Sequence, residues 1–128
     1  MQTQRPTQFF IVDDSPAIRA RLVEMLSGIR DVEVVGEAET SREAIDGILR
    51  IRPDSVLLDL NLGSGTGMEV LRGVRAQAPE IVFVVLTNHS EPQYRSACQK
   101  AGARYFLDKS TEFESVRGVI AEIIATRH

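Results

Sequence analysis

The 128-residue sequence predicts an α/β fold, a three-layer sandwich in which helices cover both faces of a parallel sheet. Two observations lead to this prediction. Five short apolar runs alternate with five segments of helical periodicity, which is typical of right-handed parallel crossovers rather than hairpins. The length, with 43% hydrophobic and 26% charged residues, fits one compact domain.

Strands are predicted where the apolar runs lie, at residues 9–12, 32–38, 55–58, 81–86 and 105–108. The third and fourth runs are almost continuously apolar, which is typical of central strands that are covered on both faces. The second run alternates apolar and polar residues at its start, as an edge strand does. We therefore place this second strand on the outside of the sheet.

Helices are predicted between the strands, from apolar residues that recur every three or four positions. The stripes are Ile18, Leu22, Met25, Leu26 and Ile29; Ala44, Ile45, Ile48 and Leu49; Met68, Leu71 and Val74; and Phe113, Val116, Ile120, Ile123 and Ile124. The stripe of Tyr94, Ala97, Cys98 and Ala101 is small and partly polar. It predicts a marginal helix that can move.

Capping residues mark the helix starts. Four pairs fit a capping box, namely Thr40 with Glu43, Thr66 with Glu69, Ser90 with Gln93, and Thr111 with Glu114. Ser15 is followed by Pro16, which a first helical turn accepts. We therefore expect the helices to begin at these positions, including the fourth at Ser90 and the fifth at Thr111.

Composition excludes several classes of protein. The formal net charge of −3 argues against direct nucleic-acid binding by this chain. The single cysteine, Cys98, has no partner for an internal disulfide, and we expect it to be packed and inert. Residues 1–7 form a polar tail rather than a signal peptide, and no apolar stretch is long enough to span a bilayer. We expect a cytoplasmic protein without a membrane partner.

Residues suited to phosphoryl chemistry follow four of the predicted strands. Asp13 and Asp14 follow the first, Asp59 the third, Thr87 the fourth and Lys109 the fifth. The carboxyl ends of parallel strands meet at one edge of a sheet, where open α/β folds bind ligands, so we expect one pocket. Mg²⁺ prefers the oxygen ligands that Asp13, Asp14 and Asp59 offer. Asp59 is the candidate nucleophile for an aspartyl phosphate, and Thr87 and Lys109 are candidate donors to the phosphoryl oxygens.

This ordered set resembles that of the receiver domains of two-component response regulators, over about residues 8–127. The resemblance implies a flavodoxin-like fold with strand order 2-1-3-4-5. It implies that Asp59 is phosphorylated from the phosphohistidine of a sensor histidine kinase or phosphotransfer protein. It also implies that Mg²⁺ is bound by Asp14, Asp59 and the backbone carbonyl of Asn61, with Asp13 acting mostly through water.

The resemblance further implies a conformational switch. The Thr87 hydroxyl moves to the phosphoryl group, and Phe106 rotates inward with it. Phe106 has no hydroxyl, so its signal would be steric. Asn88 and His89 are expected to tune the lifetime of the phosphorylated state. The resemblance implies that the face formed by residues 91–127 then binds an output partner or a second copy of the chain. It also implies a signalling switch that promotes only its own phosphorylation and dephosphorylation, rather than an enzyme.

Two other functions stay open. The loop of residues 63–67 lacks a proline that is common in the family, Ser110 stands where many members have proline, and Asn88 would crowd the pocket. These departures fit a phosphorylation-independent protein-interaction module. A small phosphatase would need a second carboxylate two residues after Asp59, where Asn61 stands. The sequence contains no output domain and fits either a stand-alone regulator or an excised receiver.

Overall fold

The computed structural model describes residues 5–127, so positions 1–4 of the predicted tail, and His128, lie outside the described residues. Within the described part the strands form one parallel sheet of order β2-β1-β3-β4-β5. They are β1 (Thr7–Val12), β2 (Val32–Ala38), β3 (Ser55–Leu58), β4 (Val82–Thr87) and β5 (Tyr105–Asp108). This order confirms the predicted fold class, with β2 at an edge. The structure includes Thr7 in β1, whereas the domain boundary at residue 8 stays a prediction.

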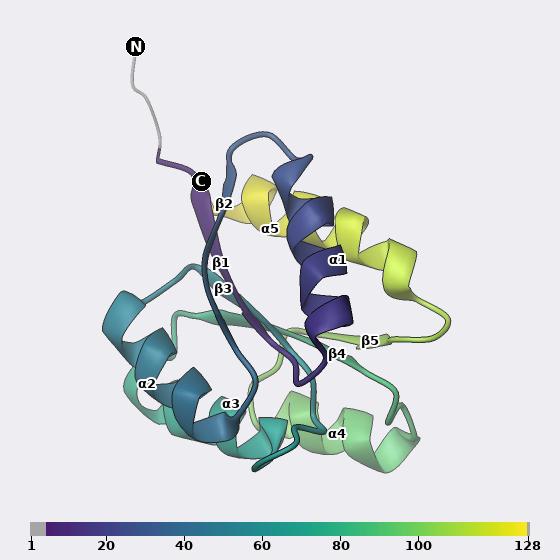
Figure 1. Ribbon diagram of the computed structural model, residues 1–128. Coiled ribbons are helices and arrows are strands. Elements are labelled where there is room, and N and C mark those ends of the chain that lie inside the picture. The colour runs from purple at the N-terminus through teal and green to yellow at the C-terminus, as the bar shows by residue number, and fades with distance from the viewer. Residues whose placement is uncertain (1–4, 128) are drawn as a thin grey trace.

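Helices cover both faces of the sheet. They are α1 (Pro16–Ser27), α2 (Ser41–Ile51), α3 (Gly67–Gln77), α4 (Pro92–Lys100) and α5 (Val116–Thr126), with a 3-10 turn at Phe113–Ser115. Figure 1 shows α1 and α5 on one face and α2, α3 and α4 on the other. Across residues 5–127, no helix combines the length and apolar character needed to cross a membrane.

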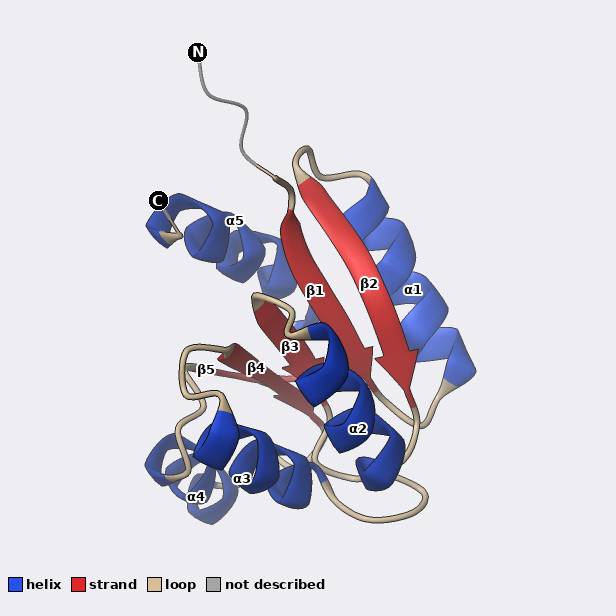
Figure 2. Ribbon diagram, turned by 90° about the vertical axis from the view of Figure 1, so that its left-hand side faces the viewer, coloured by secondary structure: helices blue, strands red, loops and turns tan. Residues whose placement is uncertain are grey.

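The two faces of the sheet bury separate apolar clusters, because successive side chains of a strand point to opposite faces. Phe9 and Ile11 of β1 pack with the residues of α1 and α5. Phe10 and Val12 pack with those of α2, α3 and α4. Each of these side chains is at most 2% exposed, and full burial of one contributes about 1.5 to 3 kcal/mol. Figure 2 shows β1 and β2 running in the same direction to one edge of the sheet.

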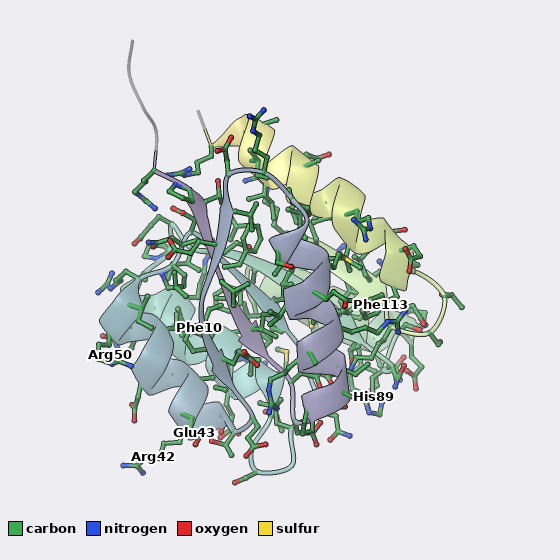
Figure 3. All side chains as sticks on the ribbon, turned by 45° about the horizontal axis from the view of Figure 1, so that its top comes forward. Phe10, Arg42, Glu43, Arg50, His89 and Phe113 are labelled. Carbon is green, nitrogen blue, oxygen red and sulfur yellow. The ribbon has the colours of Figure 1, made fainter. Side chains whose placement is uncertain are left out.

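Phe10 needs glycine on two neighbouring elements. A Cβ on Gly36 in β2 would lie 2.5 Å from the Phe10 ring, and one on Gly47 in α2 would lie 2.9 Å from it. The register between β1 and β2 shifts between Phe9 and Phe10. The labelled Phe10 in Figure 3 lies beside α2. Its ring therefore packs between the edge strand β2 and that helix.

Three of the five predicted helix starts are confirmed. The hydroxyls of Ser15 and Thr40 accept hydrogen bonds from the amides of Ile18 and Glu43, and Thr66 forms a complete capping box with Glu69. These bonds satisfy amides that have no partner within the helix.

The prediction that Ser90 and Thr111 start helices is wrong. The fourth helix begins at Pro92 without a side-chain cap, and the fifth begins at Val116 after the 3-10 turn. Both residues bind Asp108 instead, Ser90 through its hydroxyl and Thr111 through its amide. For Ser90 a tertiary partner has therefore replaced the local capping partner, whereas Thr111 takes part in a local turn with Asp108.

Candidate functional site

The strand ends place the predicted site residues at one edge of the sheet. Asp13 follows β1, Asp59 follows β3, and Lys109 follows β5. Their backbone amides donate to the carbonyls of the neighbouring strands: Asp13 to Ala38 at 3.1 Å, Asp59 to Val12 at 2.9 Å, and Lys109 to Thr87 at 2.8 Å. The sheet hydrogen bonding thus continues through the site residues and fixes their backbones.

Lys109 connects the two buried carboxylates. Its Nζ lies 2.8 Å from Asp13 Oδ2 and 2.8 Å from Asp59 Oδ2. Burial acts to lower the pKa of Lys109, but the hydrogen bonds and charges of Asp13 and Asp59 outweigh it, so this pKa lies above its ordinary value. Lys109 is therefore held as a cation between the candidate nucleophile and a second carboxylate.

Three carboxylates converge at this edge. One oxygen from each of Asp13, Asp14 and Asp59 lies within 4.8 Å of the others. The Oδ1 oxygens of Asp13 and Asp59, which do not contact Lys109, accept the amides of Ser15 at 2.9 Å and Asn61 at 3.3 Å. Three carboxylates against one ammonium leave two negative charges, and the exposed Asp14 makes the cluster accessible. The donor set therefore fits a hard divalent cation with oxygen ligands.

Arg19 supports the backbone of the site at Asp13, a role that the sequence did not predict. Its guanidinium donates to the Asp13 carbonyl oxygen at 2.6 Å and forms ion pairs with Glu37 at 3.2 Å and Glu39 at 3.6 Å. Arg19 therefore ties the start of α1 to the end of β2 behind Asp13. No local motif marks it, because its partners come from two different segments.

Thr87 lies at the end of β4 and is fully buried. Its Oγ1 accepts a hydrogen bond from the His89 amide at 3.2 Å, which leaves the hydroxyl proton free to be donated. Asn88 is exposed. The His89 ring, labelled in Figure 3, stacks at a tilt on Tyr94 with 5.6 Å between ring centroids.

Beside the site, a cavity of about 230 Å³ opens between the loop after β3 and the start of α4. It is lined by Leu60, Asn61, Thr66, Met68, His89 and Tyr94. Tyr94 is the exposed large hydrophobic residue of the described chain, at 40%. His89 and Tyr94 therefore line the same cavity as Leu60 and Asn61, the two residues that follow Asp59.

Phe106 lies inward, at 7% exposure, within the cluster under α2, α3 and α4. Arg95 of α4 donates to the Phe106 carbonyl oxygen at 3.3 Å, and its guanidinium lies 4.6 Å from the centre of the Phe106 ring. Such cation–π contacts contribute about 0.5 to 1 kcal/mol at exposed positions. Arg95 thus fastens α4, whose one buried residue is Cys98, to β5.

A family model described as the response regulator receiver domain matches residues 9–121. The uncharacterized transcriptional regulatory protein YhcZ of Bacillus subtilis is 34% identical over 106 residues, which are 83% of this chain and 50% of that protein. The nitrate/nitrite response regulator protein NarL of Escherichia coli K12 is 32% identical, over 91% of this chain and 54% of that protein. The chain thus spans about half the length of these curated relatives.

Solved structures agree with these matches. The signal receiver domain of the response regulator NarL from Mycobacterium tuberculosis has a TM-score of 0.83 and 30% identity. The match covers 94% of this chain and 98% of that one. The similarity therefore extends over the sheet and its helices.

Proposed function

The chain belongs to the response regulator receiver domain family, and from this premise we propose that Asp59 is its phosphoacceptor residue. The observation that carries the proposal is the bridge of Lys109 between Asp59 and Asp13, with 2.8 Å to each carboxylate. Asp59 is 6% exposed and lies at the end of a central strand, so its position is fixed before any donor arrives. Fixed position and compensating charge are the main contributions that a protein makes to phosphoryl transfer.

The transfer forms one bond and breaks one bond. An Asp59 carboxylate oxygen attacks the phosphorus atom of a phosphohistidine, the new P–O bond forms, and the P–N bond breaks. The electron pair of the broken bond stays on the departing imidazole nitrogen. Lys109 compensates charge on the phosphoryl oxygens, and the Thr87 hydroxyl donates to one of them.

The metal ligands in this proposal are the acidic cluster and one carbonyl. Asp13, Asp14, Asp59 and the backbone carbonyl of Asn61 would hold Mg²⁺. When bound, the ion supplies positive charge to the phosphoryl oxygens. The two uncompensated negative charges of the cluster support a divalent ion.

We further propose a sensor histidine kinase or phosphotransfer protein as the phosphodonor. Output would pass through the face of residues 91–127, to a partner or to a second copy of the chain. Thr87 and Phe106 would carry the switch to that face, and Asn88 and His89 would tune the lifetime of the phosphoryl group. The position of Phe106 between Arg95 and the core supports its part in this path, because a moving Phe106 must disturb α4.

Intact mass spectrometry tests the phosphoacceptor directly. The protein is incubated with Mg²⁺ and acetyl phosphate, and Asp59→Asn is compared with the wild type. We expect a single phosphoryl adduct on the wild type and none on Asp59→Asn. Asp46→Asn is the matched control, because it removes an exposed carboxylate of α2 that is not part of the acidic cluster and should leave the adduct in place.

An adduct on Asp59→Asn would move the phosphoacceptor to another residue. A wild type that takes no phosphoryl group, even from a histidine kinase, would favour the interaction module instead. The exposed position of Asn88 does not support the crowding that this alternative invokes. A phosphatase activity has no added support, because Asn61 provides no carboxylate for acid or base catalysis.

A further inference from the structure

Asp108 joins two loops at the edge of the candidate site. One carboxylate oxygen, Oδ2, accepts the Ser90 hydroxyl from the loop after β4. The other oxygen, Oδ1, accepts the Ser110 amide at 2.9 Å, the Ser110 hydroxyl at 2.7 Å and the Thr111 amide at 3.1 Å, all from the loop after β5. Hydrogen bonds from Ser90 and then Ser110 hold the pKa of Asp108 well below its ordinary value. The two oxygens of this carboxylate thus connect the loop after β4 to the loop after β5.

The two residues proposed to donate hydrogen bonds to the phosphoryl oxygens lie at the starts of these two loops. Thr87 stands three residues before Ser90, and Lys109 directly follows Asp108. Thr87 and Asp108 are also partners in the register of β4 and β5, and the Lys109 amide donates to the Thr87 carbonyl at 2.8 Å. The junction therefore lies where Thr87 and Lys109 are held relative to each other.

The loop after β4 is held at both of its ends. At the near end, the His89 amide binds the Thr87 hydroxyl oxygen at 3.2 Å. At the far end, the Ser90 hydroxyl binds Asp108. A Thr87 side chain that turns toward a phosphoryl oxygen gives up the His89 amide, and the loop must then move while its far end is tied to β5.

We propose that Ser90 and Asp108 are positioning residues of this site. Their hydrogen bond holds the loop after β4 in the position it has in the unphosphorylated protein, and it opposes the movement of Thr87 and this loop toward a phosphoryl group. The functional effect of this restraint rests on the proposed function, because the loop movement matters only if Asp59 is phosphorylated. Hydrogen bonds to charged groups are stronger than neutral ones, so a single Ser90 hydroxyl can set the balance between two loop positions.

The chain offers a matched set of variants. Ser90→Ala removes the bond between the loops, whereas Ser90→Thr keeps a hydroxyl at that position. Ser110→Ala removes a hydroxyl from the same carboxylate but leaves the connection between the loops intact. A general loss of support for Asp108 would affect Ser90→Ala and Ser110→Ala alike, and only the proposed link separates them.

Amide hydrogen exchange of the unphosphorylated protein tests the link itself. In Ser90→Ala we expect the His89 amide to exchange about threefold to tenfold faster, less than the loss of a fully buried hydrogen bond to a charged group would give, because Ser90 and Asp108 are only half-buried. Ser90→Thr and Ser110→Ala should exchange as the wild type does. Equal exchange in Ser90→Ala and the wild type would overturn the proposal.

The rate of adduct formation with acetyl phosphate tests the consequence. Ser90→Ala should be phosphorylated about threefold to tenfold faster than the wild type, with Ser90→Thr returned to the wild-type rate. A role in stability alone would leave this rate unchanged, and an unchanged or slower rate in Ser90→Ala would contradict the proposal. If no protein of the set forms an adduct while exchange separates them as expected, the proposed function fails and the loop restraint stands.

Discussion

Lys109 is the residue whose charge holds the site together. Asp13 and Asp59 are 2% and 6% exposed, and both of their charges face the one ammonium group. Leaving a buried charge without its partner costs about 3 to 5 kcal/mol. The local balance of charge at the site therefore depends on a single side chain.

Lys109→Met should lower the free energy of unfolding by about 3 kcal/mol near neutral pH, because two buried carboxylates lose their cation. The folded-state pKa of Lys109 is raised, so its contribution is complete below the ordinary lysine value of 10.5 and is lost only as pH rises through the higher folded value. Urea denaturation at about pH 7 and about pH 9 should give the same difference from the wild type.

Lys100→Met provides the control for this measurement. Lys100 is the chain's other lysine and is exposed on α4, so its loss should change stability by less than about 0.5 kcal/mol. If Lys109→Met were as stable as Lys100→Met, the two carboxylates would not need the ammonium group for folding.

The sequence predicts the position of a single residue well when the neighbouring residues along the chain determine it. Asp13, Asp59 and Lys109 directly follow strands, so their meeting at one edge follows from the parallel sheet. Ser90 could bind either the start of α4 or Asp108, and only the folded sheet brings Asp108 within reach. The roles of Arg19 and Ser90 were therefore not predictable from local patterns.

The turn from β3 to α3 is the element whose geometry the site tolerates least. Gly67 begins α3, and its amide donates to the Leu60 carbonyl at 2.8 Å. A Cβ at Gly67 would lie 2.3 Å from the Asp59 carbonyl oxygen and 2.7 Å from the Leu60 Cα. Both contacts are with backbone, so no side chain can move aside to relieve them.

Gly67→Ala should lower the free energy of unfolding by about 1 to 3 kcal/mol, the usual cost of overpacking. It should also slow adduct formation with acetyl phosphate, because the clash falls on the backbone of Asp59. The two measurements are chemical denaturation and the rate of mass increase.

Gly118→Ala is the matching change in α5. A Cβ there would meet nothing within 4 Å, so the variant should gain about 0.5 to 1 kcal/mol from helix propensity and keep the wild-type rate. A Gly67→Ala protein with unchanged stability and rate would mean that the turn adapts, and the tight packing would not be required.

The positions of the elements followed from periodicity, but the starts of the last two helices did not. The apolar stripes of α1, α2, α3 and α5 contain most of the residues that the two clusters bury, but the stripe predicted for α3 omitted the buried Val70. The predicted weakness of α4 agrees with Cys98 as its one buried residue. Thr111 was wrong as a helix start because Asp108 draws its amide into a tight turn before the 3-10 turn.

At the scale of the whole molecule, Asp54 connects the first strand to the end of the last helix. The Asp54 carboxylate accepts the Gln8 amide at 2.8 Å and pairs with Arg5 at 3.0 Å and Arg127 at 3.6 Å. Arg127 also donates to the Thr7 hydroxyl at 3.0 Å. Figure 1 shows the C-terminal end beside the start of β1. The layers were predictable from alternation, but this junction was not, because its members are far apart in the sequence.

Asp54→Asn should lower the free energy of unfolding by about 1 kcal/mol near pH 6, because the charged carboxylate accepts from three donors. The effect is no larger because the two arginines among these donors are partly exposed. Burial raises the pKa of Asp54, but the bonds and charges of Arg5, Gln8 and Arg127 outweigh it and place that pKa below 3.8. A carboxylate with a lowered folded pKa stabilises above its unfolded value and loses this contribution as pH falls through the folded one. The difference between Asp54→Asn and the wild type should therefore be constant from about pH 7 to pH 5 and shrink below about pH 4.

Asp46→Asn, on the exposed side of α2, should show no such trend in the same urea titrations. A difference that persists unchanged below pH 3 would assign the role of Asp54 to packing rather than to its charge.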